Sequence, residues 1–461
     1  MSIPYKAAPG TNSIQSWFLL GLIALGALAF AVIVPPFQVC DEHAHFVRAY
    51  DISLGHMVSE PVPDLPPAVV SAILRYPELL EIRYKIPASD VVSDAFGRVA
   101  VHPGTTPALA DDAGHAWLTH GILATNVYCP IAYLPASAGI WIGRLLGLPP
   151  LALLYAGRLG DVLCFVAACA LAFKLAPEYT RLMAMVALLP MTLHQAGGIT
   201  ADVMTIAVSF VAVACLLWLR QNVAKPRSLV WVGLVFAVWA VCKISPWTFA
   251  ALLLIPGYRF ASRRTWLGYI GAVALGMAAA ILVWHAISSG NLEALRARRY
   301  ADGFDMSANS RDLLTHPLGF AGAALTHEVT HYKRYIQQFV GGFGWTTDWM
   351  APVWPERFCF LLLLIVAATE RASKPFSKRE RYVLCAVFVI GVVFLHVALF
   401  VSDSFDGIQG RYFIPFSLFG LLAIRQNKFT LPNGVLTAVV ALTGSVLGIL
   451  VLSWISVRYY F

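Results

Sequence analysis

The chain has 461 residues, of which 59% are hydrophobic and only 13% are charged, and its formal net charge is +8. Soluble domains carry about 25% charged residues, so this composition excludes an ordinary soluble domain. The positive charge does not indicate a nucleic-acid partner, because the Lys and Arg residues gather in short loops between apolar segments, as in membrane proteins.

Apolar segments long enough to cross a hydrocarbon core of roughly 30 Å recur along the whole chain. We predict an all-α polytopic membrane protein in which residues 1–461 form a single transmembrane domain. No small-residue cleavage site follows the first apolar segment, so we interpret it as a retained span and not as a signal peptide. The predicted spans, about eleven in all, lie at 15–34, 150–173, 182–199, 203–219, 228–242, 246–258, 266–287, 357–369, 383–401, 412–424 and 433–455.

Basic residues alternate between the two sets of loops that join these spans. The loops after alternate spans are rich in Lys and Arg, and the opposite short loops hold almost none. By the positive-inside rule the basic loops are cytoplasmic, which places the N-terminus inside and the C-terminus outside. The basic loops contain Lys174, Arg181, Arg220, Lys225, Arg227, Arg259, Arg263, Arg264, Arg371, Lys374, Lys378, Arg379, Arg381, Arg425 and Lys428.

Two large segments, 35–149 and 288–356, then fall on the outer side. Residues 127–146 in the first are apolar enough to span, but a span there would invert every later loop. We therefore predict that they form an interfacial helix along the outer membrane surface. The second segment contains an amphipathic helix at about 317–340.

A dense cluster of ionisable side chains follows the first span. Asp41 and Glu42 stand next to each other, with His43, His45 and Arg48 close behind. On a helix that starts near Asp41, the i, i+4 spacing places His45 on the same face as Asp41. Such a cluster can supply a general base, and Arg48 can pair with a carboxylate or a phosphate. The alternative is a solvated helix start, since acids suit the positive N-terminal end of a helix.

Further polar residues stand at the outer ends of later spans. Asp202 begins the fourth span, where it could also be a helix cap. Lys243 ends the fifth span, where it could also extend its amine to water. Arg158 lies within the second span, and an intramembrane charge is a functional candidate unless an internal ion pair, here with Asp161, explains it. Arg411 opens the tenth span and could clamp a phosphate.

The predicted topology brings these distant residues to one membrane face. Acids and cations that converge there suit an anionic lipid phosphate and a hydroxyl nucleophile. We therefore predict Asp41 and Glu42 as catalytic residues. The predicted substrate-binding residues are His45, Arg48, Arg158, Asp202, Lys243, Gln409, Arg411 and Tyr412.

The segment beginning at Pro35, Pro-Pro-Phe-Gln-Val-x-Asp-Glu-x-x-His-Phe-x-Arg-Ala-Tyr, resembles the opening motif of a bacterial family of multi-spanning membrane proteins. The resemblance covers nearly the whole chain, in order. It continues through Pro-Ile-Ala-Tyr-Leu-Pro at 130–135, Leu-Tyr-Ala-Gly-Arg-Leu at 154–159, Leu-Pro-Met-Thr at 189–192, Asp202, Lys243, Gly344-Trp345 and Gln-Gly-Arg-Tyr-Phe at 409–413.

That family is similar in layout to the GT-C glycosyltransferases, which include protein O-mannosyltransferases, the lipid A aminoarabinose transferase and the oligosaccharyltransferase catalytic subunit. The resemblance implies a polyprenyl-phosphate sugar donor and an inverting transfer to a glycan, lipid or protein acceptor at the periplasmic face of the bacterial inner membrane. It assigns Asp41 as the base and Asp202 as the second acid. Charge and position assign Lys243 and Arg411 to the donor phosphate. Superfamily members are metal-dependent or metal-free, so a divalent metal stays open.

The chain departs from the family pattern at three positions. Cys40 and His43 stand where the family has proline, and Cys129 stands where a small hydroxyl residue is expected. Both cysteines are predicted to lie outside, near the membrane, in an oxidising compartment. We therefore predict a disulfide between Cys40 and Cys129.

Two other classes of protein compete with the glycosyltransferase. The motif His327-Glu328-Val329-Thr330-His331, with Glu356 as a third ligand, would make a zinc membrane metalloprotease. The same pattern can be the polar outer face of an amphipathic helix. A transporter or flippase would fit the many spans and the intramembrane charges. However, the chain has no internal repeat, and transporters seldom carry two such large outer segments.

Overall fold

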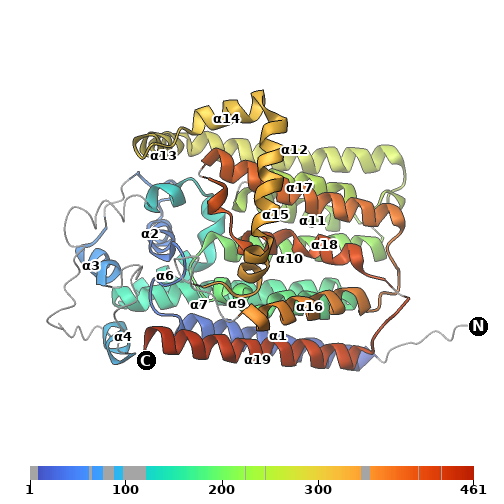
Figure 1. Ribbon diagram of the computed structural model, residues 1–461, viewed down its shortest axis with the longest axis horizontal. Helices are drawn as coiled ribbons and strands as arrows, with labels where there is room; N and C mark the ends of the chain where they lie inside the picture. The colour runs from blue at the N-terminus through green and yellow to red at the C-terminus, as the bar shows by residue number, and fades with distance from the viewer. Residues whose placement is uncertain are drawn as a thin grey trace, which may run out of the picture.

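Apolar helices that run side by side make up most of the structure (Figure 1). The computed structural model describes residues 9–61, 65–75, 88–96, 121–223, 225–243, 245–343, 353–402, 404–426 and 428–461, and this part contains no strand. The helices that share one direction are α1 (Pro9–Ile33), α7 (Pro150–Leu175), α10 (Ala201–Gln221), α11 (Pro226–Cys242), α12 (Arg263–Ile287), α16 (Val353–Thr369), α17 (Lys378–Ser402), α18 (Ile414–Ile424) and α19 (Asn433–Tyr459).

Six described helices are long and apolar enough to cross a bilayer. They are Ser13–Ile33 of α1, together with α7, α10, α12, α17 and α19. Helix α11 and the unit Gly410–Ile424 are apolar but shorter. The predicted all-helical, multi-spanning architecture is therefore confirmed, and the count of eleven spans stays a prediction.

Two predicted spans are not continuous helices. Residues 182–199 form α8 (Thr180–Ala187) and α9 (Pro190–Ala196), and the break falls where Pro190 cannot donate a backbone hydrogen bond. Residues 246–258 form the 3-10 helices η3 (Pro246–Leu254) and η4 (Gly257–Arg259). The residues of α8 and α9 are buried among other helices, where a broken helix is tolerated because protein surrounds its backbone.

Helix directions bring the basic loops to one end of the bundle. There Arg220, at the end of α10, pairs with Glu380 at the start of α17. Arg425, just after α18, donates to the backbone oxygen of Glu178 in η2 (Pro177–Tyr179). Helix α1 begins at this end and α19 finishes at the opposite end (Figure 1). The predicted grouping of the loops is present; which end faces the cytoplasm stays a prediction.

Short helices cover the other end: α2 (Glu42–Ser53), α3 (Pro67–Arg75), α4 (Ala88–Ala95), η1 (Pro130–Tyr133) and α6 (Leu134–Leu145). Helix α6 packs antiparallel against the first half of α7. A Cβ on Gly139 would lie 2.1 Å from the Ala156 carbonyl oxygen, and one on Gly160 would lie 2.1 Å from that of Pro135. These glycines let the two backbones touch, so the axis of α6 lies alongside that of α7. The interfacial helix predicted for residues 127–146 would instead lie across the ends of the spans.

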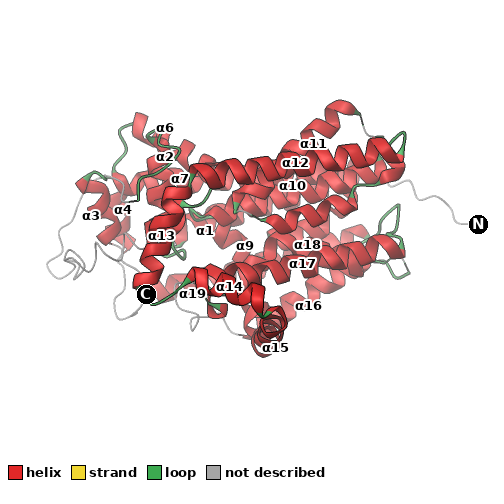
Figure 2. Ribbon diagram, turned by 90° about the horizontal axis from the view of Figure 1, so that it is seen from above, coloured by secondary structure: helices red, strands yellow, loops and turns green. Residues whose placement is uncertain are grey.

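A second group of helices leads away from α12: α13 (Ser289–Ala301), α14 (Met306–Thr315) and α15 (Pro317–Gly341). Helix α15 is the predicted amphipathic helix. It runs across the other helices, upright in Figure 1 and nearly end-on in Figure 2. It contacts α9, α16 and the 3-10 helix η6 (Gly410–Phe413). Residues 62–64, 76–87, 97–120 and 344–352 of the two predicted outer segments, including the Gly344-Trp345 motif, lie outside the described residues.

Candidate functional site

A tight loop between α1 and α2 presents Asp41. Phe37 (φ 60°) and Asp41 (φ 61°) are the described non-glycine residues with positive φ. Backbone of this kind costs energy and clusters at functional sites, and Asp tolerates it better than most residues. Asp41 precedes α2 without capping it through its side chain, which is 46% exposed. Its carboxylate instead accepts a hydrogen bond from Cys40 Sγ at 3.3 Å and lies 3.9 Å from Arg411 Nη2.

Glu42 and Arg158 form a fully buried ion pair. The Nε and Nη2 atoms of Arg158 donate to the two Glu42 oxygens at 2.8 and 2.6 Å. Arg158 also donates to the backbone oxygens of Ala31 and Val34 at the end of α1, and Glu42 accepts from the N–H of Ile199. Both side chains are fully buried and engaged, which favours a structural role for the pair. The predicted catalytic role of Glu42 and substrate-binding role of Arg158 stay predictions.

The expected partner of Arg158 was wrong. Asp161 lies one turn further along α7 and interacts with the backbone N–H of Ala136 in α6. The Arg158 guanidinium points instead toward the end of α1, where backbone oxygens that no helix bond satisfies need donors. Arg158 thus ties α1, α2 and α7 together and holds the loop that carries Asp41.

The two other polar residues predicted on α2 differ in their surroundings. His45 Nδ1 lies 2.7 Å from the Tyr133 hydroxyl, and burial lowers the pKa of His45 to about 3, so the ring is neutral. Arg48 is buried and donates to Ser59 Oγ at 2.6 Å and to the Met57 carbonyl at 2.8 Å. Arg48 therefore anchors the loop after α2, and its predicted contact with substrate stays a prediction.

Three helix ends bring Asp202, Lys243 and Arg411 together. Asp202 lies in the first turn of α10, Lys243 directly follows α11, and Arg411 lies in η6, the 3-10 helix that leads into α18. Lys243 Nζ lies 2.6 Å from Asp202 Oδ1, and Arg411 Nε lies 3.7 Å from Asp202 Oδ2. With Asp41 on the other side of Arg411, the four side chains form a chain of alternating charge. The predicted convergence of these residues is therefore present in the structure.

Aromatic rings hold the Lys243 amine in place. Its Nζ lies 4.7 Å from the ring centre of Tyr412 and 5.7 Å from that of Tyr128, within the range of cation–π contacts. Burial lowers the pKa of Lys243, but Asp202 and the two tyrosines outweigh this effect and the net pKa is raised. Lys243 is therefore a permanent cation. Tyr412 was predicted to belong to the site. Tyr128, which stands just before the Pro-Ile-Ala-Tyr motif, was not.

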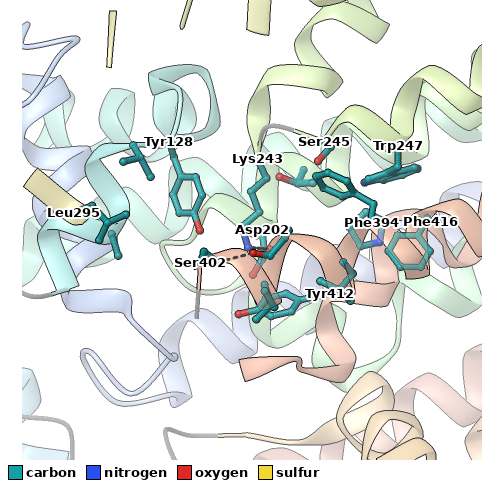
Figure 3. Close-up of a pocket in the computed structure, with 18 of the residues that line it drawn as sticks. Tyr128, Asp202, Lys243, Ser245, Trp247, Leu295, Phe394, Ser402, Tyr412 and Phe416 are labelled. Carbon is teal, nitrogen blue, oxygen red and sulfur yellow. Dashed lines mark hydrogen bonds and ion pairs between the residues drawn. The ribbon is translucent and has the colours of Figure 1, made fainter. Parts of the chain in front are cut away.

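A cavity of about 430 Å³ adjoins this ion pair. Tyr128, Asp202, Lys243 and Tyr412 belong to its polar part, and Trp247, Phe394 and Phe416 gather on one side of the ion pair (Figure 3). The apolar wall follows one face of α17, a candidate membrane span, at helical spacing. The lining residues of this wall on α17 are Gly391, Phe394, Leu395, Ala398, Leu399 and Ser402. This helical periodicity is the signal that could have found them.

The charge of the cavity is positive. Among its described lining residues, Lys243 and Arg299 are cations and Asp202 is the anion, and Arg411 stands behind Asp202. Arg299, on α13, was not predicted. Gln409 is half-buried just before η6 and does not line the cavity. An anionic group is the ligand that this arrangement favours.

The predicted disulfide is wrong. Cys40 and Cys129 are both free and buried in different surroundings. Cys40 donates to Asp41, whereas Cys129 packs with Val241 and Trp284. Burial raises the pKa of Cys40 to about 12, so the thiol is protonated beside the carboxylate.

The third ligand expected for the His-Glu-x-x-His motif is also wrong. Glu356, on α16, lies against Gln337 and Gly341 near the end of α15, about 15 Å along the helix from His327. Asp406, in η5 (Phe405–Gly407), lies beside the two histidines instead. The group His327, His331 and Asp406 is the described cluster with the geometry to hold a metal ion.

Comparisons with known proteins give the family of the chain. Searches of curated proteins and of solved structures gave no match. A family model described as "Predicted membrane protein (DUF2142)" matches residues 24–419. This match extends from α1 to α18 and includes Asp41, Asp202, Lys243 and Arg411. The chain is therefore a member of the DUF2142 family of predicted membrane proteins.

Proposed function

We propose that the protein is a glycosyltransferase that moves a sugar from a polyprenyl-phosphate donor to a hydroxyl group of a glycan, lipid or protein acceptor, with inversion at the anomeric carbon. In this proposal the protein spans the bacterial inner membrane and the cavity faces the periplasm. The observation that carries the proposal is a cavity in which a Lys–Asp pair at helix ends adjoins an apolar wall along a candidate span. A ligand with an anionic head and a hydrocarbon chain matches both parts.

The cations would bind the donor phosphate. Lys243 lines the cavity, and Arg411 lies on the other side of Asp202 from Lys243. When the sugar–phosphate bond breaks, negative charge grows on the leaving phosphate, and fixed cations stabilise that charge more than the charge of the ground state. Asp202 contacts both cations, so its role in this proposal is to hold them in position before the donor binds. The polyprenyl chain would lie along the wall of Phe394 and Phe416.

Asp41 would act as the general base. Its side chain is about half-exposed and lies on the far side of Arg411 from Asp202, so an acceptor hydroxyl can approach it. In the transfer step, the acceptor oxygen attacks the anomeric carbon and its proton passes to the Asp41 carboxylate. The bond from the anomeric carbon to the phosphate oxygen breaks, and polyprenyl phosphate leaves with the electron pair.

The test is turnover by the purified full-length protein in lipid nanodiscs. A panel of polyprenyl-phosphate sugars is offered, and sugar transfer or donor hydrolysis is measured for wild type, Asp41→Asn and Asp312→Asn. Asp312 is an exposed carboxylate on α14 and serves as the matched control. Turnover that is lost only in Asp41→Asn supports the proposal. Donor that is bound or moved across the bilayer without chemical change by wild type would overturn it in favour of a flippase.

A further inference from the structure

A second polar cluster lies on α15, apart from the residues that line the cavity. His327 and His331 are one helical turn apart, and their rings stack with centroids 4.1 Å apart. Asp406, from η5, places its Oδ1 3.6 Å from His327 Nε2. Each of the three residues offers one ligand atom, and these atoms lie within 4.8 Å of one another. Zinc requires roughly 2.0–2.2 Å to each ligand, so the three side chains must draw together around an ion, and the exposed position of Asp406 leaves room for this movement.

Hydrogen bonds to the other ring nitrogens prepare both histidines as ligands. His331 Nδ1 lies 2.9 Å from the His327 carbonyl oxygen, and a carbonyl only accepts, so Nδ1 carries the proton. The neutral ring then has its lone pair on Nε2. His327 Nδ1 lies 2.8 Å from the Tyr335 hydroxyl. Histidine ligands of metals are usually held by such a partner on the second nitrogen.

One of the candidate ligand atoms is poorly satisfied. His327 Nε2 is buried, and Asp406 Oδ1, at 3.6 Å, lies just beyond hydrogen-bond distance. A buried polar atom of this kind costs free energy unless something binds it. The ring is 12% exposed, whereas Asp406 is 83% exposed, so an ion could enter from the Asp406 side.

We propose that His327, His331 and Asp406 bind one divalent transition-metal ion, with a water in the remaining position. Two imidazoles and one carboxylate suit zinc and its neighbours, and they do not suit magnesium or calcium, which prefer oxygen ligands. The ion clamps η5 to α15. It is separate from any metal at the cavity, and its binding does not depend on the proposed function.

The clamp lies close to the segment that carries Arg411. Gly410 already packs on α15, since a Cβ there would lie 2.2 Å from the Tyr335 carbonyl oxygen, and its N–H donates to Gln338. Asp406 stands five residues before Arg411 in the same connection between α17 and α18. A metal at Asp406 therefore adds a second anchor to this connection.

The same geometry argues against a protease. In a His-Glu-x-x-His protease the Glu acts as general base on the metal-bound water. Here Glu328 Oε2 lies 3.3 Å from His396 Nε2 on α17. The motif on α15 thus supplies two ligands, and its Glu contacts a neighbouring helix.

Metal binding tests the proposal directly. The purified full-length protein in nanodiscs is stripped with a chelator, given Zn²⁺ or Mg²⁺ alone, and washed, and bound metal per chain is measured together with the melting temperature. We expect one zinc per chain, a higher melting temperature with zinc, and no effect of magnesium. His331→Ala and Asp406→Asn lose the zinc. Tyr335→Phe, which removes the partner of a ligand, weakens zinc binding by about 10- to 100-fold.

A matched control comes from α14, where His316 and Asp312 form an exposed pair at i, i+4 spacing. His316→Ala should bind zinc as wild type does. Failure of the wild type to retain zinc, or equal retention by wild type and Asp406→Asn, would overturn the proposal. Because Asp406 is exposed, its substitution keeps the test valid if His331→Ala does not fold.

Discussion

The two ends of the helix bundle both bury charged side chains, but they use them differently. At the end with the basic loops, Glu370 accepts backbone N–H groups from Arg181 and Leu182 and faces the guanidinium of Arg425. A cavity beside Arg220 at this end has a volume of about 20 Å³, room for about one water molecule. At the other end, Asp202 and Lys243 line a cavity of about 430 Å³.

This comparison separates structural from ligand-binding charges. A buried carboxylate whose oxygens are all engaged by backbone and arginine ties helices together. A carboxylate or amine that turns one side to a large cavity remains available to a ligand. Position along the bundle does not by itself decide whether a charged side chain is available to a ligand. The Glu42–Arg158 pair lies at the cavity end, yet its contacts resemble those of Glu370.

The largest expected effect is on activity at Asp41. Asp41→Asn removes the proposed base and should lower the rate of sugar transfer by about 10²- to 10⁴-fold. The melting temperature should stay near that of wild type, because the side chain is half-exposed and caps no helix. Initial rates and thermal unfolding of the same preparations check this. An unchanged rate would remove Asp41 from the mechanism.

The next effect is the loss of the cavity cation. Lys243→Gln should lower the rate by about 10²- to 10³-fold, because the phosphate that leaves loses a fixed positive charge. Lys333→Gln, at an exposed lysine on α15, is the control and should leave the rate unchanged. Rates at saturating donor make the comparison. If both variants were equally active, the cavity would not bind the phosphate.

Substitution of the structural carboxylates should lower the stability of the protein and not its activity. Glu42→Gln and Glu370→Gln each leave a buried arginine without its partner, which costs about 3–5 kcal/mol of stability. The rate per folded molecule should change little for Glu370→Gln, which is at the end opposite the cavity. Thermal unfolding in detergent, with activity normalised to folded protein, tests both. A wild-type melting temperature in either variant would contradict the structural role.

The smallest expected effect is a loss of stability in acid. Burial lowers the pKa of His45 to about 3, against 6.5 when unfolded, so the unfolded chain binds a proton that the folded chain does not. The stability is complete above pH 6.5 and is lost as the pH falls from 6.5 toward 3, by about 1.4 kcal/mol per unit. His45→Gln should flatten the fall in melting temperature between pH 7 and 5. His285→Gln, at an exposed position, should leave it as in wild type.

Much of the architecture and part of the site follow from local sequence patterns. Apolar segments predicted the helices, and amphipathic spacing predicted α15. Because Asp41, Asp202, Lys243 and Arg411 all stand at helix ends, the direction of each helix was enough to bring them to one side. Their convergence could therefore be predicted without any contact being known.

Partners could not be predicted in the same way. Arg158 pairs with Glu42, more than a hundred positions away, and not with Asp161 on its own helix, because the end of α1 and the start of α2 come to lie beside it. Asp406, not Glu356, joins the two histidines of α15 for the same reason. The close packing of α6 on α7 depends on Gly139 and Gly160. Their importance cannot be recognised until the two helices are seen in contact.

The sequence by itself determined that this protein is a helical membrane protein and which charged residues share an end of the bundle, because hydrophobicity and charge act along the chain. Only the tertiary structure decided which charged side chains have all their polar atoms paired within the protein and which face a cavity. That choice depends on which helices become lateral neighbours, and the packing of the whole bundle sets it.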